Sequence, residues 1–296
     1  MLHRQQARSG HRAAVYDLAV DADGFFSAAA DGYLVHWHRD DVDLGRVVAT
    51  VEGGKFLCLD TVPGGLVAGT LDGGVHWLYP DQPDRNRHVA RHAHGVFSVV
   101  RVEDEVFTAG GDGVLCRWSV ATARTLESVP LSKQSLRRIA YDPVYDRIAA
   151  GASDGMIYLL DRSSLQVLDR VPAHPPSCFA LDFSADGEFL FSGGRDAILR
   201  RWSAIGGKLK ESQWVTGHLM TINSLAIHPE GNFVATAGRD KTVKIWGTKD
   251  LLLHKVVEAV RDRGHVNSVN TLAWLDDRTL ITAGDDRRIL EWQFSP

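Results

Sequence analysis

Histidine, hydroxyl and aspartate side chains recur together in five segments of the chain, and these are the side chains of a nucleophilic catalytic triad. Each segment also has a tryptophan six residues after its aspartate. The five groups are His11, Ser27, Asp31 and Trp37; His94, Thr108, Asp112 and Trp118; His174, Ser192, Asp196 and Trp202; His218, Thr236, Asp240 and Trp246; His265, Thr282, Asp286 and Trp292. An enzyme needs one such set at a pocket, whereas five sets in register indicate a role that every repeating unit shares. We therefore interpret the groups as structural and predict no catalytic residue among them.

Clustered histidines raise the alternative of a metal site. His88, His92 and His94 lie close together in the chain, and His36 and His38 are two residues apart. Neither cluster has a cysteine or carboxylate at ligand spacing, and His94 is already assigned to one of the five groups. The glycines fall in turns and form no phosphate-binding loop of the Walker or dinucleotide type. The sequence therefore predicts neither a metal nor a cofactor.

The aspartates mark a repeat that covers the whole chain. Seven of them follow a small residue and one variable residue, at spacings of 40 to 46 residues: Asp31, Asp72, Asp112, Asp154, Asp196, Asp240 and Asp286. The second and fourth copies lack the histidine and the hydroxyl, and they have Leu78 and Leu160 in place of tryptophan. Length alone would suggest about two domains, but seven units of this size use the entire sequence. We predict that residues 1–296 form one domain.

The clearest copy, residues 217–246, begins with a Gly-His pair and contains three short strands. The strands are expected over residues 222–227, up to Thr236 and over residues 242–246, with Asp240 in the tight turn between the last two. This segment closely resembles a WD40 repeat. The resemblance implies an all-β, seven-bladed WD40-type β-propeller with four-stranded blades. It also implies that the tryptophan, hydroxyl, histidine and aspartate of each complete copy form one hydrogen-bonded chain.

Two further expectations follow from the resemblance. Leu2 to Arg8 would supply the outer strand of the last blade, because the chain stops soon after Trp292, and this strand would close the ring. The second and fourth blades lose all the buried hydrogen-bonding partners together, so we expect them to be held mainly by apolar packing.

Composition and charge argue against several classes of protein. The net charge is -4 without runs of like charge, which makes a nucleic-acid partner unlikely on this ground. No stretch is long and apolar enough to span a membrane, and the N-terminus lacks a secretory pattern. Cys58, Cys116 and Cys178 fall in different repeats and are interpreted as reduced packing residues. These observations predict a cytoplasmic protein, and we expect a monomeric ring.

A partner surface is expected on the face that carries the Gly-His connections and the Asp turns, which we call the top. The resemblance implies that these two elements share one rim of the ring, and that the residue before each repeat aspartate and a residue early in each first strand face solvent there. They place an apolar and aromatic sector on blades one to three and a basic sector on blades four to six. The candidates for partner binding are Tyr16, Leu71, Phe97, Arg137, Arg138, Arg195, Arg239 and Asp285. Arginine and aromatic side chains are enriched at binding hot spots, so the sequence predicts a non-enzymatic scaffold or adaptor that binds a protein or peptide on the top face.

Three alternatives stay open. In the first, the basic sector is only a solvated face without a partner. In the second, the basic sector binds nucleic acid. In the third, the protein is an enzyme with its site in the central channel. The inward candidates for that site, Asp17, Asp60, Arg101, Asp142 and Asp182, form no recognisable acid–base or metal pattern in the sequence.

Overall fold

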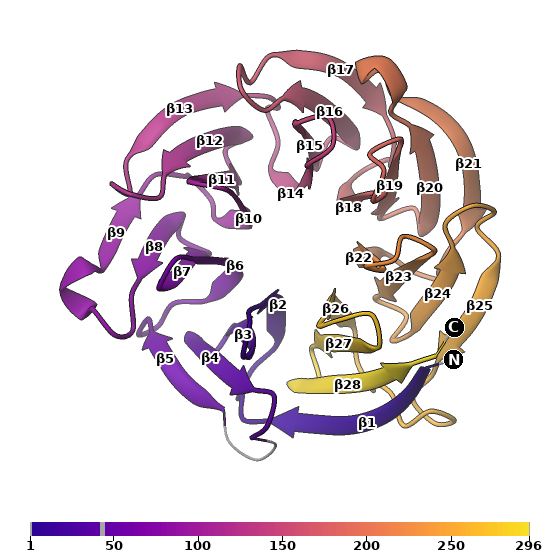
Figure 1. Cartoon of the computed structure of the whole chain (residues 1–296), viewed down its shortest axis with the longest axis horizontal. Helices are drawn as coiled ribbons and strands as arrows, with labels where there is room; N and C mark the ends of the chain where they lie inside the picture. The colour runs from indigo at the N-terminus through magenta and orange to yellow at the C-terminus, as the bar shows by residue number, and fades with distance from the viewer. Residues whose placement is uncertain (1, 42–44, 296) are drawn as a thin grey trace.

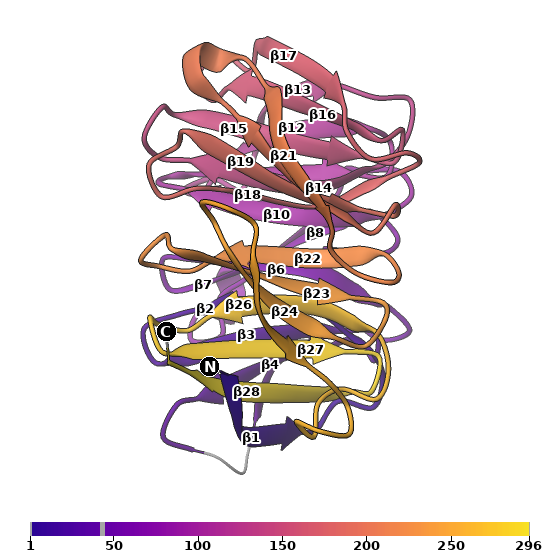
Figure 2. The ribbon, with the colours of Figure 1, turned by 90° about the vertical axis from the view of Figure 1, so that its right-hand side faces the viewer.

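Short strands and tight turns alternate along the whole chain. The computed structural model describes residues 2–41 and 45–295, and within them the chain forms seven antiparallel sheets of four strands each. The sheets surround a common axis as blades (Figure 1), and the view from the side shows a ring of stacked, twisted blades (Figure 2). The predicted seven-bladed all-β propeller is confirmed.

The blades follow one another in sequence. Blade 1 contains β2 (Val15–Val20), β3 (Gly24–Ala29), β4 (Tyr33–His38) and β5 (Arg46–Thr50); blade 2 contains β6 (Phe56–Val62), β7 (Gly65–Thr70), β8 (Gly74–Leu78) and β9 (Arg87–Ala90); blade 3 contains β10 (Val96–Val102), β11 (Glu105–Gly110), β12 (Val114–Ser119) and β13 (Thr125–Pro130). Blade 4 contains β14 (Leu136–Asp142), β15 (Arg147–Ala152), β16 (Met156–Asp161) and β17 (Val167–Pro172); blade 5 contains β18 (Cys178–Phe183), β19 (Phe189–Gly194), β20 (Ile198–Ser203) and β21 (Lys210–Thr216). Blade 6 contains β22 (Ile222–Ile227), β23 (Phe233–Gly238), β24 (Val243–Gly247) and β25 (Leu253–Val257); blade 7 contains β26 (Val269–Trp274), β27 (Thr279–Gly284), β28 (Arg288–Phe294) and β1 (Leu2–Ser9). Two short 3-10 helices, Pro83–Arg85 and Ile205–Gly207, lie in connections.

The N-terminal strand closes the ring, as predicted. β1 pairs antiparallel with β28, from Leu2 opposite Phe294 to Ser9 opposite Arg288, and both views place the two strands side by side (Figures 1 and 2). The buried Arg8 then crosses to blade 1, where its Nη1 donates to the backbone oxygens of His38 and Asp41 at 3.0 and 2.8 Å. Pairing with β28 removes an exposed sheet edge, and Arg8 joins the last blade to the first.

The hydrophobic core lies between neighbouring blades. Trp37 of blade 1, for example, packs in one buried cluster with Val15 of its own blade and with Ile281 and Ile289 of blade 7. Strands inside the blades, such as β15 and β27, are buried along almost their whole length because each blade is covered on both sides by its neighbours, whereas outer strands such as β13 and β21 alternate or are exposed. Packing of this kind makes the ring rigid and fixes the inner strands around the axis.

Candidate functional site: the mouth of the central channel

The repeated polar groups form hydrogen-bonded chains inside the blades. In blade 1, Trp37 Nε1 donates to Ser27 Oγ at 2.8 Å, Ser27 Oγ lies 2.7 Å from His11 Nε2, and His11 Nδ1 lies 3.0 Å from Asp31 Oδ2. Because a carboxylate only accepts, His11 Nδ1 carries the proton and Nε2 accepts from the serine. Equivalent chains end on Asp196, Asp240 and Asp286.

These chains cannot act as catalytic triads. The hydroxyl side chains Ser27, Thr108, Ser192, Thr236 and Thr282 are fully buried. Each hydroxyl oxygen accepts a hydrogen bond from a tryptophan, so it is both shielded from a substrate and already engaged. The geometry favours a structural role for all five groups.

In blade 3 the histidine of the chain is His92, and the prediction of His94 was wrong. His92 Nδ1 lies 3.0 Å from Asp112 Oδ1, and its Nε2 lies 2.7 Å from Thr108 Oγ1, which also accepts from Trp118. Gly110 makes room for the ring, since a Cβ there would lie 2.0 Å from His92 Nδ1. His94 is exposed and has a positive φ of 64°, which places it in the turn that follows.

Blades 2 and 4, which we expected to be held mainly by apolar packing, also contain polar contacts to the repeat aspartate that the sequence did not predict. In blade 2, the Thr70 hydroxyl donates to Asp72 and lies 3.3 Å from His76 Nε2. In blade 4, the hydroxyl of Tyr158 donates to Asp154 at 3.0 Å. A neighbouring side chain thus bonds each repeat aspartate where the histidine is missing.

A β-bulge at the top of every inner strand places one side chain at the mouth of the central channel. In each of the seven inner strands the pairing register shifts around the second residue. These bulge residues are Tyr16, Leu57, Phe97, Arg137, Phe179, Asn223 and Asn270. Bulges re-aim side chains and bend the strand, and here the same device is used in every blade.

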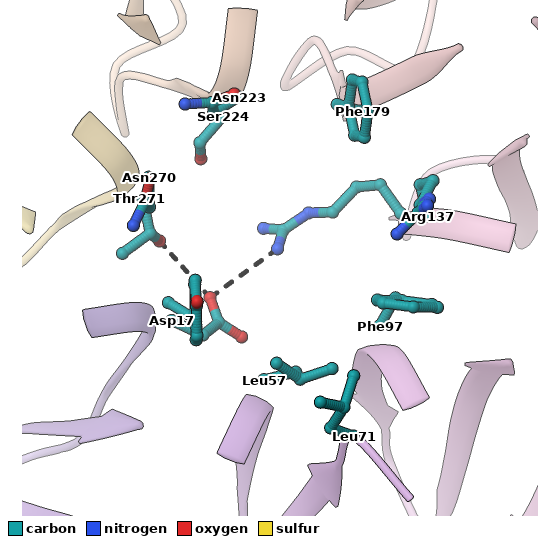
Figure 3. A pocket seen from close by; sticks show the side chains of 12 residues that line it. Asp17, Leu57, Leu71, Phe97, Arg137, Phe179, Asn223, Ser224, Asn270 and Thr271 are labelled. Atoms are coloured by element: carbon teal, nitrogen blue, oxygen red, sulfur yellow. Dashed lines mark hydrogen bonds and ion pairs between the residues drawn. The ribbon is translucent and has the colours of Figure 1, made fainter. Parts of the chain in front are cut away.

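The bulge residues surround a cavity of about 360 Å³ at the top of the channel. All seven line it, together with Leu71 and with the next residue of four inner strands, Asp17, Arg138, Ser224 and Thr271 (Figure 3). We call these twelve residues the channel mouth. One side of it is apolar, with Leu57, Leu71 and Phe97, and the opposite side carries the amides of Asn223 and Asn270.

Arg137 and Arg138 supply the positive charge of the channel mouth. The Arg137 guanidinium lies over the ring of Phe97 at 4.2 Å and near that of Phe179 at 5.6 Å, and its Nε donates to Ser153 Oγ at 2.7 Å. Burial lowers the pKa of Arg137. Arg138 Nη1 lies 3.8 Å from Asp17 Oδ1, so this second arginine has a carboxylate partner.

The structure brings together some of the predicted partner-binding residues and separates others. Tyr16, Leu71, Phe97, Arg137 and Arg138 all line the channel mouth. The remaining three, Arg195, Arg239 and Asp285, do not line it; the two arginines are exposed, and Asp285 accepts a bond from Asn270 Nδ2 at 2.8 Å. Asp17, Ser224 and Thr271 were not among the predicted partner-binding residues, although their position directly after each bulge residue is a signal that the aligned repeats contain.

Three of the inward acids join neighbouring blades. Their carboxylates accept backbone N–H groups from the next inner strand: Asp17 from Leu59 at 3.1 Å, Asp60 from Arg101 at 2.7 Å, and Asp182 from Ile227 at 2.9 Å. Asp142 belongs to a different place, since it forms a buried ion pair of 2.6 Å with Arg147 at the turn between β14 and β15. These contacts give a structural role to the four acids that the sequence offered as candidates for an enzyme site in the channel.

Asp182 gives the fold a testable pH dependence. Burial raises the pKa of Asp182 to about 6, above its value in the unfolded chain. The folded state therefore keeps a proton that the unfolded state has lost, and the stabilising contribution of this carboxyl falls as the pH rises through about 6. Because asparagine imitates the protonated form, the stability of Asp182→Asn relative to wild type should be higher at pH 7.5 than at pH 4.5 by on the order of 1–2 kcal/mol.

Urea unfolding of both proteins at the two pH values measures this difference. The pH dependence of all other groups cancels in the comparison of variant with wild type. An equal difference at both pH values would show that Asp182 titrates normally in the folded protein.

The described part of the chain contains neither a cluster of metal-ligating side chains nor a membrane-spanning helix. Within residues 2–41 and 45–295, no group of three or more His, Cys, Asp or Glu side chains is arranged to hold a metal ion. Over the same ranges, no helix is long and apolar enough to cross a membrane.

Comparison with known proteins connects the geometry to one repeat family. Residues 165–203, 209–247 and 258–293 match the family model described as WD domain, G-beta repeat. A solved structure, the WD40 β-propeller domain of Doa1, superposes with a TM-score of 0.86 at 17% identity, covering 100% of this chain and 97% of that one.

Similarity to two curated proteins extends over nearly the whole of this chain. The chain is 24% identical over 303 residues to actin-interacting protein 1 of Caenorhabditis elegans, covering 97% of this chain and 48% of that protein. It is 22% identical over 291 residues to the 66 kDa stress protein of Physarum polycephalum, covering 96% of this chain and 47% of that protein. The chain therefore spans about half the length of these two relatives.

Proposed function

Since this chain is a WD40-repeat β-propeller, we propose that it is a non-enzymatic protein-interaction module that binds a segment of a partner protein in its channel mouth. Fold alone does not fix function, so the proposal depends on the site. The observation that carries it is the set of seven bulges, which turn one side chain from every blade toward the same cavity.

The lining of the channel mouth suits a peptide better than a small polar metabolite. Leu71 is 46% exposed at the rim, and the aromatic rings of Phe97 and Phe179 stand beside an arginine. Apolar surface, aromatic rings and arginine are the features of protein-binding hot spots. The rigid ring presents them in a fixed arrangement, which lowers the entropy cost of binding.

Selection from a peptide-display library on the immobilised protein tests the proposal. Leu71→Ser removes an apolar side chain from the channel mouth, and Val144→Ser is the matched control in the turn between β14 and β15, on the opposite face, where Val144 is 52% exposed. The selected peptides should bind Leu71→Ser about tenfold more weakly than wild type, because burying one such side chain contributes roughly 1.5 kcal/mol to the binding free energy. The control should bind like wild type.

Two results would contradict the proposal. One is that the wild type enriches no peptide family above background. The other is that Leu71→Ser and Val144→Ser bind the enriched peptides equally well, which would place the binding surface outside the channel mouth.

The relative named actin-interacting protein 1 makes actin the first whole protein to examine. Co-sedimentation with actin filaments, using wild type and the same two variants, tells whether actin is a partner and whether the channel mouth contacts it.

A further inference from the structure

Resting on the function proposed above, we propose that the channel mouth selects a peptide carrying one carboxylate side chain, and that Arg137 binds this carboxylate. The Arg137 guanidinium is a charged group without a carboxylate partner among the described residues. Within the described residues no carboxylate lies at ion-pair distance from Arg137, although Arg138 beside it has Asp17. A partly buried, unpaired charge is costly, and a ligand anion would offset that cost.

The surroundings of Arg137 hold its guanidinium ready for a ligand. Phe97 and Phe179 flank the guanidinium, and the bond from Nε to Ser153 uses only one of its donors. Arginine has further N–H donors on its two terminal nitrogens, and a carboxylate accepts from such a pair in a bidentate arrangement. A side chain fixed in this way loses little conformational freedom when it binds.

The charge of the cavity favours a single negative charge. The channel mouth contains two arginines, Arg137 and Arg138, and one carboxylate, Asp17. The excess is one positive charge, so a carboxylate balances it, whereas a doubly charged phosphate would leave an unbalanced negative charge near Asp17. A lysine or arginine of the partner would be repelled.

The apolar side of the cavity indicates which type of residue stands near the acidic residue in the bound peptide. Leu57 and Leu71 lie on the same side as Phe97, whose ring contacts Arg137. A segment in which a leucine-like residue stands close to a glutamate or aspartate would place one side chain against the leucines and the other at the guanidinium. The expected partner is therefore an acidic and apolar peptide segment.

A double-mutant cycle on a display-selected peptide tests the proposal. We expect enriched peptides to share one acidic position. Changing that residue from Glu to Gln should weaken binding to the wild type about tenfold, but should change binding to Arg137→Gln little, as measured by calorimetry. A phosphoserine at the same position should bind more weakly than Glu.

Folding of the Arg137→Gln variant is checked by circular dichroism, and Ser153→Ala provides a second, milder variant. It removes the bond that orients Arg137 but keeps the charge, so binding of the Glu peptide should weaken a few fold.

Each failure identifies what is wrong. Enriched peptides that lose affinity for Leu71→Ser and yet share no acidic position would contradict the selection of a carboxylate. That result would still agree with peptide binding in the channel mouth. If changing Glu to Gln in the peptide weakened binding to the wild type and to Arg137→Gln equally, Arg137 would not be the residue that binds the carboxylate. Tighter binding of the phosphoserine peptide than of the Glu peptide would contradict the preference for a singly charged group. Absence of any enriched peptide would overturn both proposals.

Discussion

Replacing His92 by alanine should lower the free energy of unfolding by about 2–4 kcal/mol, while replacing His94 should change it by less than about 0.5 kcal/mol. His92 bonds both Asp112 and Thr108 in the interior of blade 3. Its removal leaves the buried Thr108 hydroxyl without its histidine acceptor and creates a cavity under the top surface. His94 is exposed, so its loss removes little.

Chemical denaturation of the two variants beside wild type measures this difference. The pair is well matched because both histidines lie in the same connection, two residues apart, and both replacements keep the Cβ atom. If His94→Ala were the more destabilised protein, the blade 3 hydrogen-bonded chain described above would be wrong.

Deleting residues 2–9 should lower the melting temperature by about 10 °C or more, since a loss of several kcal/mol shifts the midpoint by roughly 2–4 °C per kcal/mol in a protein of this size class. The deletion removes β1, and with it the buried side chains of Leu2 and Arg8. It exposes the edge of β28 and the cluster around Trp292, and it breaks the link to blade 1. Differential scanning fluorimetry gives the midpoint.

Rescue in trans provides the control for this deletion. A synthetic peptide of residues 2–9 should raise the melting temperature of the shortened protein and should leave that of the wild type unchanged. A shortened protein that melts at the wild-type temperature would show that β1 contributes little to ring closure.

Much of the fold could be predicted because the repeat restates it seven times. The spacing of the aspartates gave the number of blades, and the absence of an outer strand after Trp292 indicated the role of Leu2 to Arg8. A single weak motif would not support such conclusions, but features in register throughout the chain do.

The error at His94 came from applying the interval between histidine and aspartate too loosely, because no Gly-His pair marks the start of this copy and two histidines stand close together in the segment Arg91-His92-Ala93-His94. In the other four chains the histidine stands 20 to 22 residues before the aspartate, and His92 stands 20 before Asp112. His94 is too close to Asp112 for that interval, so the separation could have identified the correct residue.

The channel mouth was only partly predictable, because it depends on backbone geometry. A β-bulge changes the direction of a side chain without a distinctive residue type, and the bulge residues include Tyr16, Arg137 and Asn223. The contacts of Thr70 and Tyr158 with the repeat aspartates of blades 2 and 4 were not predicted either. In the complete blades the aspartate is bonded by a histidine from a different segment of the chain, so the aligned repeats do not show which side chain takes its place.

The most direct test of the proposed function is a crystal structure of the protein with a display-selected peptide. We expect the peptide to lie across the top of the ring, with one side chain inside the cavity between Leu57, Leu71 and Arg137. A peptide bound to the outer strands, to the turn around Val144 or elsewhere, with the channel mouth empty, would contradict the account.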